Sequence, residues 1–556
     1  MKLVECVPNF SEGRDKKIID QIASVIEETE EVKLLDVDMG ADTNRTVVTF
    51  VGSPEGVAEA AFKAIKKASE LIDMAKHKGA HARMGATDVC PFVPVANVTM
   101  EECVEIAKKV GKRVGDELGI PVYLYEYAAT KPERKNLAVI REGEYEGLPE
   151  KLKKTEWKPD FGPAQFNAKS GATVIGAREF LIAYNINLAT KDKKLANKIA
   201  FEIREKGKVK RDENGKIVRD ENGNKVYIPG KFKEVKAVGW YMEEFGCAQV
   251  SINFTNYKIS PVHIVFDEVC RLADQLGVRV TGSELVGLIP KDAIIQAGMH
   301  YLKKQGSSTA VPENVVVDIA VRSLGLNDLY PFEPDKKIIE YIINKDRKLL
   351  VDMSVSDFVD ELSSDSPAPG GGSVSALAGS LAAGLGAMVT NLTFGKKAYK
   401  DVFELMSELG TKLQSYKQSF IDYIDKDTDS FNKIMDAFKL PKKTEEQIAI
   451  RNQAIQEATK DATMIPFEVM TKITEIVDML YEISQKGNQN SLSDAGVSLL
   501  MARSGLEGAY MNVLINLQGI EDQKFKNDIK SKADELKETY TKKIDEYLRE
   551  IYNKLV

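Results

Sequence analysis

The chain has 556 residues and a formal net charge of −7, which argues against a nucleic-acid binder because such proteins carry a basic patch or a high pI. Its five cysteines are scattered and absent from the second half, so they form neither a disulfide framework nor a zinc motif and suit a reducing compartment. The start lacks the long apolar core of a secretion signal, and we expect a cytoplasmic protein of several domains.

The first part of the chain is expected to alternate strands with helices. Apolar and β-branched runs predict the strands, and apolar residues at helical spacing predict the helices. In chain order these are strand Leu3–Val7, helix Lys16–Glu28, strands Val32–Val37 and Thr46–Val51, a helix opened by Pro54, strand Phe92–Val95, a helix from Met100 and strand Val122–Tyr125. The opening order β-α-β-β-α-β is that of a ferredoxin-like unit.

The same pattern then returns in the next part of the chain. The expected elements are Phe180–Leu188 (strand), Asp192–Lys206 (helix), Val235–Tyr241 and Ala248–Phe254 (strands), Pro261–Leu276 (helix) and Val278–Thr281 (strand). We therefore expect two ferredoxin-like α/β subdomains that face each other. Interfaces between such units are a preferred place for ligand pockets.

A polar insert interrupts the second subdomain near residues 207–230. The sequence Arg-Asp-Glu-Asn-Gly occurs at 211–215 and again at 219–223. Asn-Gly is a strong signal for a hairpin turn. The insert is interpreted as a solvated hairpin, with a flexible flap as the alternative.

The character of the chain changes after about residue 330. Pro331 and Pro334 mark a boundary, and a charged connector follows at 345–348. Long helical stretches then replace the strands, at Val374–Leu392, Val402–Phe438, Glu445–Gln485, Ser493–Leu517 and Asp522–Leu555. These predict an all-helical bundle domain. The expected domains are 1–178 and 179–330 for the α/β subdomains, 331–350 for a linker and 351–556 for the bundle.

One uncharged stretch, Ser373–Phe394, has about the length that a bilayer requires. It consists largely of Gly, Ala and Ser, which let helices approach closely in a soluble core as well as in a membrane. We expect a buried helix and no membrane span. Ser373, which follows Gly370–Gly372, is a good residue for its N-cap, and a glycine-rich helix start can hold an anion.

Two of the four histidines, His77 and His81, lie in one glycine-containing stretch that also carries Arg83 and Asp88. Histidine exchanges protons near neutral pH, and loops carry much of the chemistry of enzymes, so a catalytic site is one interpretation. A surface or satisfied core histidine is the alternative. The spacing His-x-x-x-His also suggests zinc, but Gly79 lies between them and no third ligand is near, so we expect no metal.

Several long motifs resemble the glutamate formimidoyltransferases: Val4–Gly13, Asn44–Val47, Arg83–Phe92, Asp160–Pro163 and Gly171–Arg178. In the second half, Ala368–Ser373, Lys439–Lys442 and Gly508–Leu517 resemble the formimidoyltetrahydrofolate cyclodeaminases. The order of the halves is similar to that of the fused, bifunctional formimidoyltransferase-cyclodeaminase family. The departures are the insert near 207–230, and Ala80 and Ala82 beside His81.

The resemblance implies a folate-dependent bifunctional enzyme of histidine degradation, a transferase and a lyase. The first half would move the formimidoyl group from N-formimidoyl-L-glutamate to N5 of tetrahydrofolate. The second would convert 5-formimidoyltetrahydrofolate to 5,10-methenyltetrahydrofolate and ammonia. It further implies tetrahydrofolate as co-substrate, carried between sites on a polyglutamate tail. It also implies a homo-oligomer that forms through both domains and in which bundles pair.

The resemblance also assigns residues to the first reaction. The family's proton acceptor falls on His81, which suits an attacking amine that must lose a proton. Asp38, at the end of a predicted strand, is a candidate to orient that imidazole, and Arg45 and Arg83 are candidates to hold the donor's carboxylates. The family's folate-binding segment falls on Gly162, Pro163, Ala164, Gln165, Phe166, Asn167, Ala168, Lys169, Ser170 and Gly171.

In the second reaction ammonia leaves readily only when it is protonated, and the family's acid falls on Asp427. Its neighbours Asp425 and Asp429 lie on the same predicted helix. Successive helical residues point about 100° apart, so Asp425 and Asp427 cannot both face one pocket. Charges on a helix are otherwise most often a solvated face.

Two other functions remain open at this point. One is an enzyme that prefers N-formylglutamate as donor, or that has a single active domain. The other is a folate-binding scaffold without catalysis. The presence of both His81 and Asp427 favours the bifunctional enzyme.

Overall fold

The structure is a computed structural model and describes residues 2–41, 43–79, 81–243, 245–344 and 349–556. Ala80 and the connector predicted at 345–348 lie outside the described residues. The chain divides into two compact units: one of Met1–Ala297 and Val321–Lys345, the other of Gly298–Ala320 and Asp346–Val556. The first is mixed α/β and the second is largely helical, which confirms the predicted fold class at this level.

The first unit contains a mixed sheet in which β1 and β2 share the central position. Its spatial order is β3, β4, β1 with β2, β5, β7, β6, and the bounds are β1 (Leu3–Cys6), β2 (Asn9–Phe10), β3 (Val32–Gly40), β4 (Arg45–Gly52), β5 (Thr87–Ala96), β6 (Val122–Glu126) and β7 (Thr173–Ala177). β1 is antiparallel to both β4 and β5, whereas β7 continues parallel to β5. The first residues of the chain therefore lie in the middle of the sheet.

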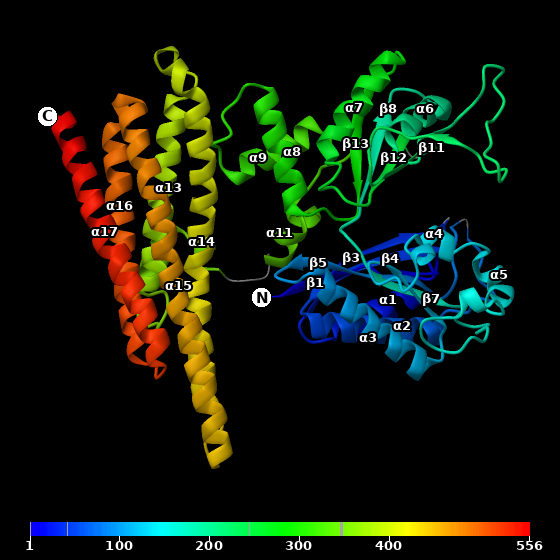
Figure 1. Cartoon of the computed structure of the whole chain (residues 1–556), viewed down its shortest axis with the longest axis horizontal. Helices are drawn as coiled ribbons and strands as arrows, with labels where there is room; N and C mark the ends of the chain where they lie inside the picture. Colours follow the sequence, from blue (N-terminus) through cyan, green and yellow to red (C-terminus); the bar gives the residue numbers. More distant parts are fainter. Residues whose placement is uncertain (1, 42, 80, 244, 345–348) are drawn as a thin grey trace. The chain divides into compact units, whose positions relative to one another are not determined.

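Helices α1 (Lys16–Glu27), α2 (Pro54–Leu71) and α3 (Met100–Leu118) cover one face of this sheet (Figure 1). The N-cap of α2 is Ser53, whose side chain accepts a hydrogen bond from the backbone of Gly56, with Pro54 in the first turn. The short helices α4 (Leu137–Ile140) and α5 (Glu144–Lys151) contribute to a separate cluster on the opposite face.

A second, antiparallel sheet follows in the same unit. Its spatial order is β11, β12, β8, β13, with bounds β8 (Ile182–Leu188), β11 (Val235–Met242), β12 (Cys247–Phe254) and β13 (Val280–Val286). Helices α6 (Lys193–Ile203) and α7 (Val262–Gln275) pack on one face. Along β11, buried Val235 and Ala237 alternate with exposed Lys236 and Val238, so the other face of this sheet is open at that strand.

The polar insert forms a hairpin, as the sequence predicts. Strands β9 (Lys208–Val209) and β10 (Tyr227–Ile228) pair antiparallel. Asp212 and Asp220 organise its two repeated turns, because each carboxylate accepts hydrogen bonds from the backbone two and four residues ahead. The side chains of both turns are exposed.

The boundary between the units does not follow the chain continuously. The next helices are α8 (Lys291–Lys304), α9 (Glu313–Ser323), α10 (Pro334–Lys337) and α11 (Ile339–Asn344). Residues 298–320 belong to the helical unit, where the Thr309 hydroxyl contacts those of Ser407 and Thr411 at 2.9 and 2.6 Å. The stretch predicted as a linker contains α10 and α11 and buries Ile338 and Ile339, because these apolar side chains gain from leaving water.

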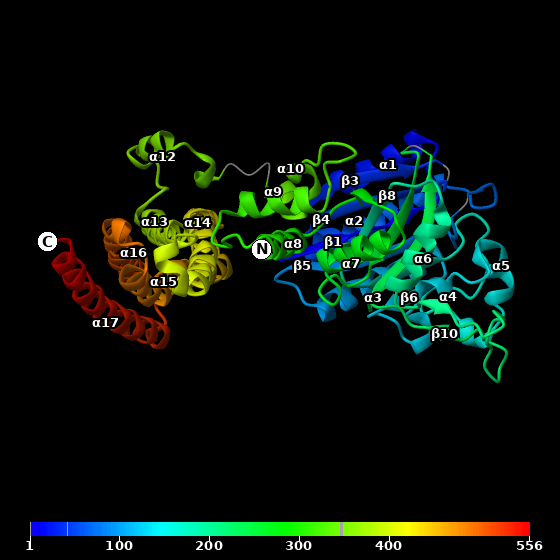
Figure 2. The ribbon, with the colours of Figure 1, turned by 90° about the horizontal axis from the view of Figure 1, so that it is seen from above.

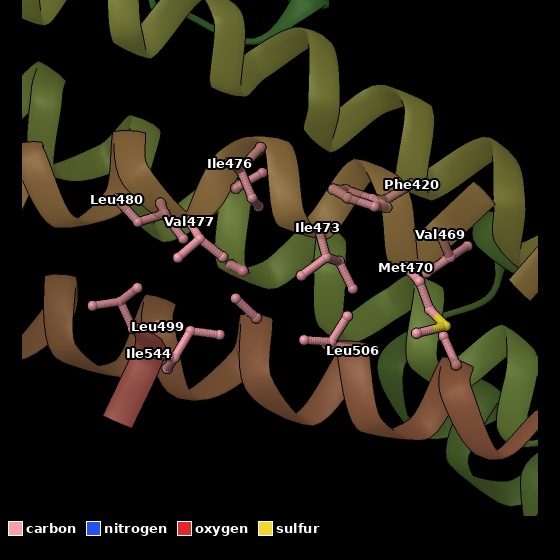
Figure 3. Packing of buried hydrophobic residues seen from close by; sticks show 14 of the residues in the cluster. Phe420, Val469, Met470, Ile473, Ile476, Val477, Leu480, Leu499, Leu506 and Ile544 are labelled. Atoms are coloured by element: carbon pink, nitrogen blue, oxygen red, sulfur yellow. The ribbon is translucent and has the colours of Figure 1, made fainter. Parts of the chain in front are cut away.

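The helical unit is a bundle whose long helices match the predicted stretches closely. They are α13 (Gly371–Thr393), α14 (Phe403–Lys439), α15 (Glu445–Lys486), α16 (Leu492–Gln518) and α17 (Gln523–Leu555). The short helix α12 (Val355–Leu362), which no predicted stretch covers, precedes them. Figure 2 views α13 to α16 nearly along their axes, with α17 beside α15 and α16. The core is a continuous apolar cluster in which Phe420, Ile473 and Leu506 come from three different helices (Figure 3).

Helix α13 owes its central place to its small residues. A Cβ at Gly386 would lie 2.4 Å from Cδ2 of Leu480, so a larger residue there would force the Leu480 side chain to move. Among the described residues α13 is the one helix long and apolar enough for a membrane span by length and composition, and 61% of its most apolar window is buried in the bundle. The predicted N-cap is wrong: α13 begins at Gly371 after Gly370, because Ser373 directs its hydroxyl to the Ile424 carbonyl and to Asp427 instead.

Candidate active sites

The first unit encloses a cavity of about 860 Å³ between the open faces of its two sheets. The first sheet supplies most of the floor, and Ala183, Lys236, Asn253 and Val286 come from the strands of the second. The predicted residues His81, Arg45 and Asp38 all line this cavity. The expectation of a pocket between the two α/β subdomains is thus met by the geometry of the first unit.

His81 is held with one ring nitrogen against the backbone. Its Nδ1 lies 2.6 Å from the carbonyl oxygen of Ala82, and a carbonyl only accepts, so Nδ1 carries the proton. Nε2 then keeps its lone pair and is the basic atom of the ring. Burial lowers the pKa of His81, and the charges of Arg45 and Arg141 lower it further, so the imidazole is neutral near neutral pH.

Arg45 connects His81 to a buried carboxylate. One terminal nitrogen donates to Asp88 at 2.6 Å and lies 3.0 Å from Nδ1 of His81, while Nε and the other nitrogen donate to Asn9. Since Nδ1 is already protonated, the approach of Arg45 to His81 is an electrostatic contact rather than a second hydrogen bond. It opposes protonation of the ring.

Asp88 is shared by two arginines, because Arg141 also donates to it. Desolvation raises the pKa of the Asp88 carboxyl, but Arg141 and Arg45 lower it more, so its pKa lies below the ordinary value and it is ionised. Two guanidinium groups therefore face one carboxylate, which leaves a surplus positive charge beside His81. Arg45 and Arg141 both line the cavity, where a substrate carboxylate can meet this charge.

Asp38 was expected to orient the imidazole of His81, but it makes no direct bond to that ring in the described structure. It lies on β3 opposite Val47 of β4, is exposed, and lines the cavity. Within the described ranges, no hydrogen bond joins it to His81. The carboxylate that the structure connects to the imidazole is Asp88, through Arg45.

Arg83 and His77 belong to a different cluster, outside the cavity lining. The guanidinium of Arg83 donates to Glu144 and Glu146, and its Nε donates to Nδ1 of His77 at 3.2 Å. Nε2 of His77 lies 2.8 Å from the carbonyl oxygen of Asn44 and donates to it. Both ring nitrogens of His77 are thus hydrogen-bonded, which agrees with a structural role. The guanidinium of Arg83 is likewise hydrogen-bonded to side chains of the chain itself.

The segment Gly162–Gly171 lies beside this second cluster and does not line the cavity. Gly171 forms a bridge with Gly85 and has φ of 66°, where a side chain would be strained, and its missing Cβ would meet the Met84 carbonyl at 2.1 Å. The Tyr145 hydroxyl donates to the Ala168 carbonyl, and the Tyr145 ring packs on Phe166. Gly162 through Gln165, Ala168 and Lys169 are exposed, so the segment presents backbone and side chains to solvent.

The sequence interpretation missed Arg141 altogether and did not assign Asp88 or Asn9 a role. Asp88 and Asn9 stand inside the motifs quoted for the family, so a signal for them existed. Arg141 follows a helix of four residues, and no pattern in its surroundings distinguishes it from the other charged residues nearby.

In the bundle, Asp427 lies on α14 and packs against the start of α13. The Ser373 hydroxyl donates to its carboxylate at 3.2 Å, and Gly372 is so close that a Cβ there would lie 2.1 Å from Oδ1. Burial raises the pKa of Asp427, while hydrogen bonds from Ser373 lower it in part, and the net shift is upward. Asp427 is therefore a half-buried carboxyl with an increased tendency to keep its proton.

The two neighbouring acids on α14, Asp425 and Asp429, point in other directions, as the 100° rotation per residue predicts. Asp425 accepts a hydrogen bond from the backbone nitrogen of Leu350 at 2.7 Å. Asp429 is exposed. Asp427 is thus the member of the group that faces the glycine-rich start of α13. In the ranges that the structure describes, no group of three or more His, Cys, Asp or Glu is arranged to hold a metal ion.

Comparisons with known proteins cover both units. Three family models match: the formiminotransferase domain, N-terminal subdomain, over residues 3–178, the formiminotransferase domain over 183–344, and formiminotransferase-cyclodeaminase over 354–535. A formimidoyltransferase-cyclodeaminase of Gallus gallus is 45% identical over 529 residues, which cover 95% of this chain and 94% of the relative.

Two further relatives each match part of the chain. A glutamate formimidoyltransferase of Streptococcus pyogenes is 44% identical over 302 residues, 54% of this chain and 94% of that protein. A methenyltetrahydrofolate cyclohydrolase of Methylorubrum extorquens is 38% identical over 172 residues, 31% of this chain and 83% of that protein.

Proposed function

Because this chain belongs to the formimidoyltransferase-cyclodeaminase family, we propose that it is a folate-dependent bifunctional enzyme of histidine degradation. The first unit would transfer the formimidoyl group from N-formimidoyl-L-glutamate to N5 of tetrahydrofolate and release glutamate. The helical unit would act as a lyase that forms 5,10-methenyltetrahydrofolate and ammonia. The observation that carries the proposal is the neutral imidazole of His81, which lines the 860 Å³ cavity beside a surplus positive charge.

In the transfer, His81 is proposed as the general base. N5 of tetrahydrofolate attacks the amidine carbon of the donor and must lose its proton as the new bond forms, and Nε2 of His81 can accept it. The backbone carbonyl of Ala82 holds Nδ1–H and so maintains the tautomer that leaves Nε2 basic. The same proton can then return to the nitrogen of the departing glutamate.

The donor carries two carboxylates, and the charge around Asp88 supports a site for one of them. We assign this role to Arg45, as the sequence suggested, and extend it to Arg141. Arg83 is retained as a second candidate for donor binding, but its bonds to Glu144 and Glu146 would have to open first. The role proposed for Asp38 is electrostatic, as an exposed carboxylate in the cavity wall.

Tetrahydrofolate is the proposed co-substrate, and the segment Gly162–Gly171 remains the proposed binding site for part of it. The exposure of most of this segment agrees with a ligand that lies across its surface. We further propose that the folate is polyglutamylated, so that one molecule can visit both catalytic sites.

In the second reaction, Asp427 is proposed as the general acid. The raised pKa of its carboxyl keeps a proton available, and that proton can pass to the nitrogen that leaves as ammonia. The proton of the attacking N10 must leave as the ring closes, so the acid can be regenerated. Asp425 is expected to have a structural role through its bond to Leu350.

Pairing of bundles in a homo-oligomer is supported by α13. Val374, Leu381 and Met388 recur every seven residues on this uncharged helix, and 37–48% of each side chain is exposed. An apolar stripe of this kind is typical of an interaction surface. We therefore propose a cytoplasmic homo-oligomer.

We also propose that the first unit consists of two ferredoxin-like subdomains. The support is that the order β3, β4, β1, β5 within the first sheet corresponds to the order β11, β12, β8, β13 of the second. The proposed domains remain 1–178, 179–330 and 351–556, with 331–350 between them.

The proposal is tested with the purified full-length chain, tetrahydrofolate and N-formimidoylglutamate. We expect methenyltetrahydrofolate absorbance together with free ammonia. Product from N-formylglutamate alone would favour a formyl donor, and binding of folate without turnover would favour a scaffold. The cyclohydrolase relative adds one alternative for the helical unit, because decay of added methenyltetrahydrofolate would indicate attack by water.

A further inference from the structure

Glu5 is a buried acid that none of the roles above uses. It lies on β1 in the middle of the first sheet, is 2% exposed, and lines the cavity floor. Its neighbours across the strands are Val51 and Val93. Within the described residues, no hydrogen bond to its carboxyl is found.

An acid in this place is costly for the fold. Desolvation raises the pKa of Glu5 to about 8, against the pull of Arg178, and Glu340 raises it further. A buried carboxyl without a partner destabilises the folded state, whereas a valine like its neighbours would not. The unsatisfied group is aimed into the cavity, which points to a ligand as its missing partner.

The position of Glu5 separates it from the chemistry at His81. Asn9, which accepts two hydrogen bonds from Arg45, lies four residues along the chain, or about 13 Å for extended strands. The floor between them carries the apolar side chains of Val7, Val89 and Pro91. Glu5 therefore lies too far away to serve as an acid or base at the atoms that His81 reaches, and it can contact only a distal part of a bound substrate.

Charge decides which part of the substrate this is. The donor and the folate tail end in carboxylates, which an acid repels. The pterin ring instead presents adjacent N–H donors, its 2-amino group and N3–H, across the fused ring from N5. A carboxylate offers two acceptor oxygens in a matching arrangement, and such charge-assisted pairs are strong when buried.

We propose that Glu5 recognises the pterin ring of tetrahydrofolate by accepting hydrogen bonds from its 2-amino group and N3–H. The inference rests on the proposed transferase function and adds a specificity-determining residue to the same cavity. The ring would lie over the apolar floor, with N5 toward His81 and its amino edge at Glu5. The two N–H donors favour the ionised carboxylate, so the bound ligand supplies the hydrogen bonds that no described group of the chain gives to Glu5.

The experiment measures binding to the full-length chain by calorimetry, with two probes. 5-Formyltetrahydrofolate contains the pterin, and p-aminobenzoyl-pentaglutamate carries the tail without it. We expect Glu5→Leu to weaken binding of 5-formyltetrahydrofolate by about 10- to 100-fold and to leave the tail probe unchanged. Glu5→Gln should be intermediate, because its amide oxygen still accepts one N–H.

Glu340→Gln is the matched control. Glu340 is also a carboxyl with a pKa raised by burial, but it accepts a hydrogen bond from the backbone of Lys291 and does not line the cavity. Its variant should bind both probes at least as tightly as the parent, because loss of the Glu340 charge lowers the pKa of Glu5 and favours its ionised form. Equal losses for both probes, or no loss for 5-formyltetrahydrofolate, would overturn the inference. If Glu5→Leu does not fold, the isosteric Glu5→Gln decides by the same comparison.

The result is separate from that of the proposed function. A parent chain that binds 5-formyltetrahydrofolate through Glu5 but forms no product would contradict the enzyme and leave the pterin contact standing. Full turnover by the parent chain, together with unchanged folate affinity in the Glu5→Leu variant, would support the enzyme and contradict the pterin contact.

Discussion

The two proposed proton-transfer groups, His81 in the first unit and Asp427 in the bundle, have opposite shifts of pKa with one leading cause. Burial disfavours the charged form in both cases, so it lowers the pKa of the imidazole and raises that of the carboxyl. The result is a neutral base in one unit and a neutral acid in the other. Desolvation, the leading cause at both sites, thus favours the neutral form of each group.

The neighbours of the two groups differ more than their burial does. His81 is surrounded by fixed charges, with Arg45 and Arg141 both held by Asp88. The hydrogen bonds that lower the pKa of Asp427 come from Ser373, at the start of a helix built from small residues. The charged site is suited to a donor with two carboxylates, whereas the neutral one is suited to a ring closure that expels ammonia.

The largest expected effect comes from removing the base. His81→Ala should reduce formimidoyl transfer by about 100- to 10,000-fold and spare the conversion of supplied 5-formimidoyltetrahydrofolate, because the two sites lie in separate units. Methenyltetrahydrofolate absorbance reports both steps together when N-formimidoylglutamate and tetrahydrofolate are supplied, and the second step alone when 5-formimidoyltetrahydrofolate is supplied. His77→Ala is the control and should cost far less, since both its nitrogens bond within the chain. An equal loss in the control would contradict the assignment.

Asp427→Asn should have the converse effect. Its amide has no acidic proton, so we expect the second step to fall by about 100-fold or more while transfer continues. 5-Formimidoyltetrahydrofolate should then accumulate, which chromatography of the folates detects. Asp425→Asn serves as the control, with a milder effect through its contact with Leu350. A dead Asp425 variant beside an active Asp427 variant would reverse the two roles.

Arg141→Gln should sharpen the comparison at the charged site. Removing one of the two cations at Asp88 cancels the surplus charge, and we expect KM for N-formimidoylglutamate to rise by about tenfold, as for one lost charge-assisted bond. Steady-state kinetics at fixed tetrahydrofolate measures this. Arg83→Gln is informative beside it, because a larger rise in that variant would mean that Arg83 leaves its glutamates and binds the donor.

The smallest effects are expected from pH. Because the pKa of His81 is lowered, transfer should hold its kcat/KM as pH falls through about 6.5 and decline only below it. The second step needs protonated Asp427 and should weaken as pH rises through the raised pKa of that carboxyl. Separate pH profiles of the two steps, with opposite slopes, would follow. A transfer midpoint above pH 6.5 would contradict the lowered pKa described for His81.

The fold was largely predictable because its elements are strongly periodic. Most expected strands and helices of the first unit and the long bundle helices lie within a few residues of their expected bounds, but β5 begins five residues early and β13 ends five residues late. Strand β7 and helices α4, α5, α8, α9, α10 and α11 were missed by the prediction from sequence. α4 and α5 carry too few residues for a pattern, and α10 and α11 occupy the predicted linker. Residues 298–320 join the bundle because their contacts are with α13 and α14, far along the chain.

The candidate sites divide in the same way between sequence and structure. The resemblance to the family led us to propose the histidine and the bundle aspartate, and Arg45 stands in one of its motifs, because the resemblance is carried by short runs of consecutive residues. Only the tertiary structure brought Asp88 and Arg141 to Arg45, tied Arg83 to Glu144 and Glu146, and left Glu5 on the cavity floor without a hydrogen bond from the described residues. Contacts across strands and loops depend on which faces meet, and burial, which sets the pKa values of His81 and Asp427, exists only once those faces have met.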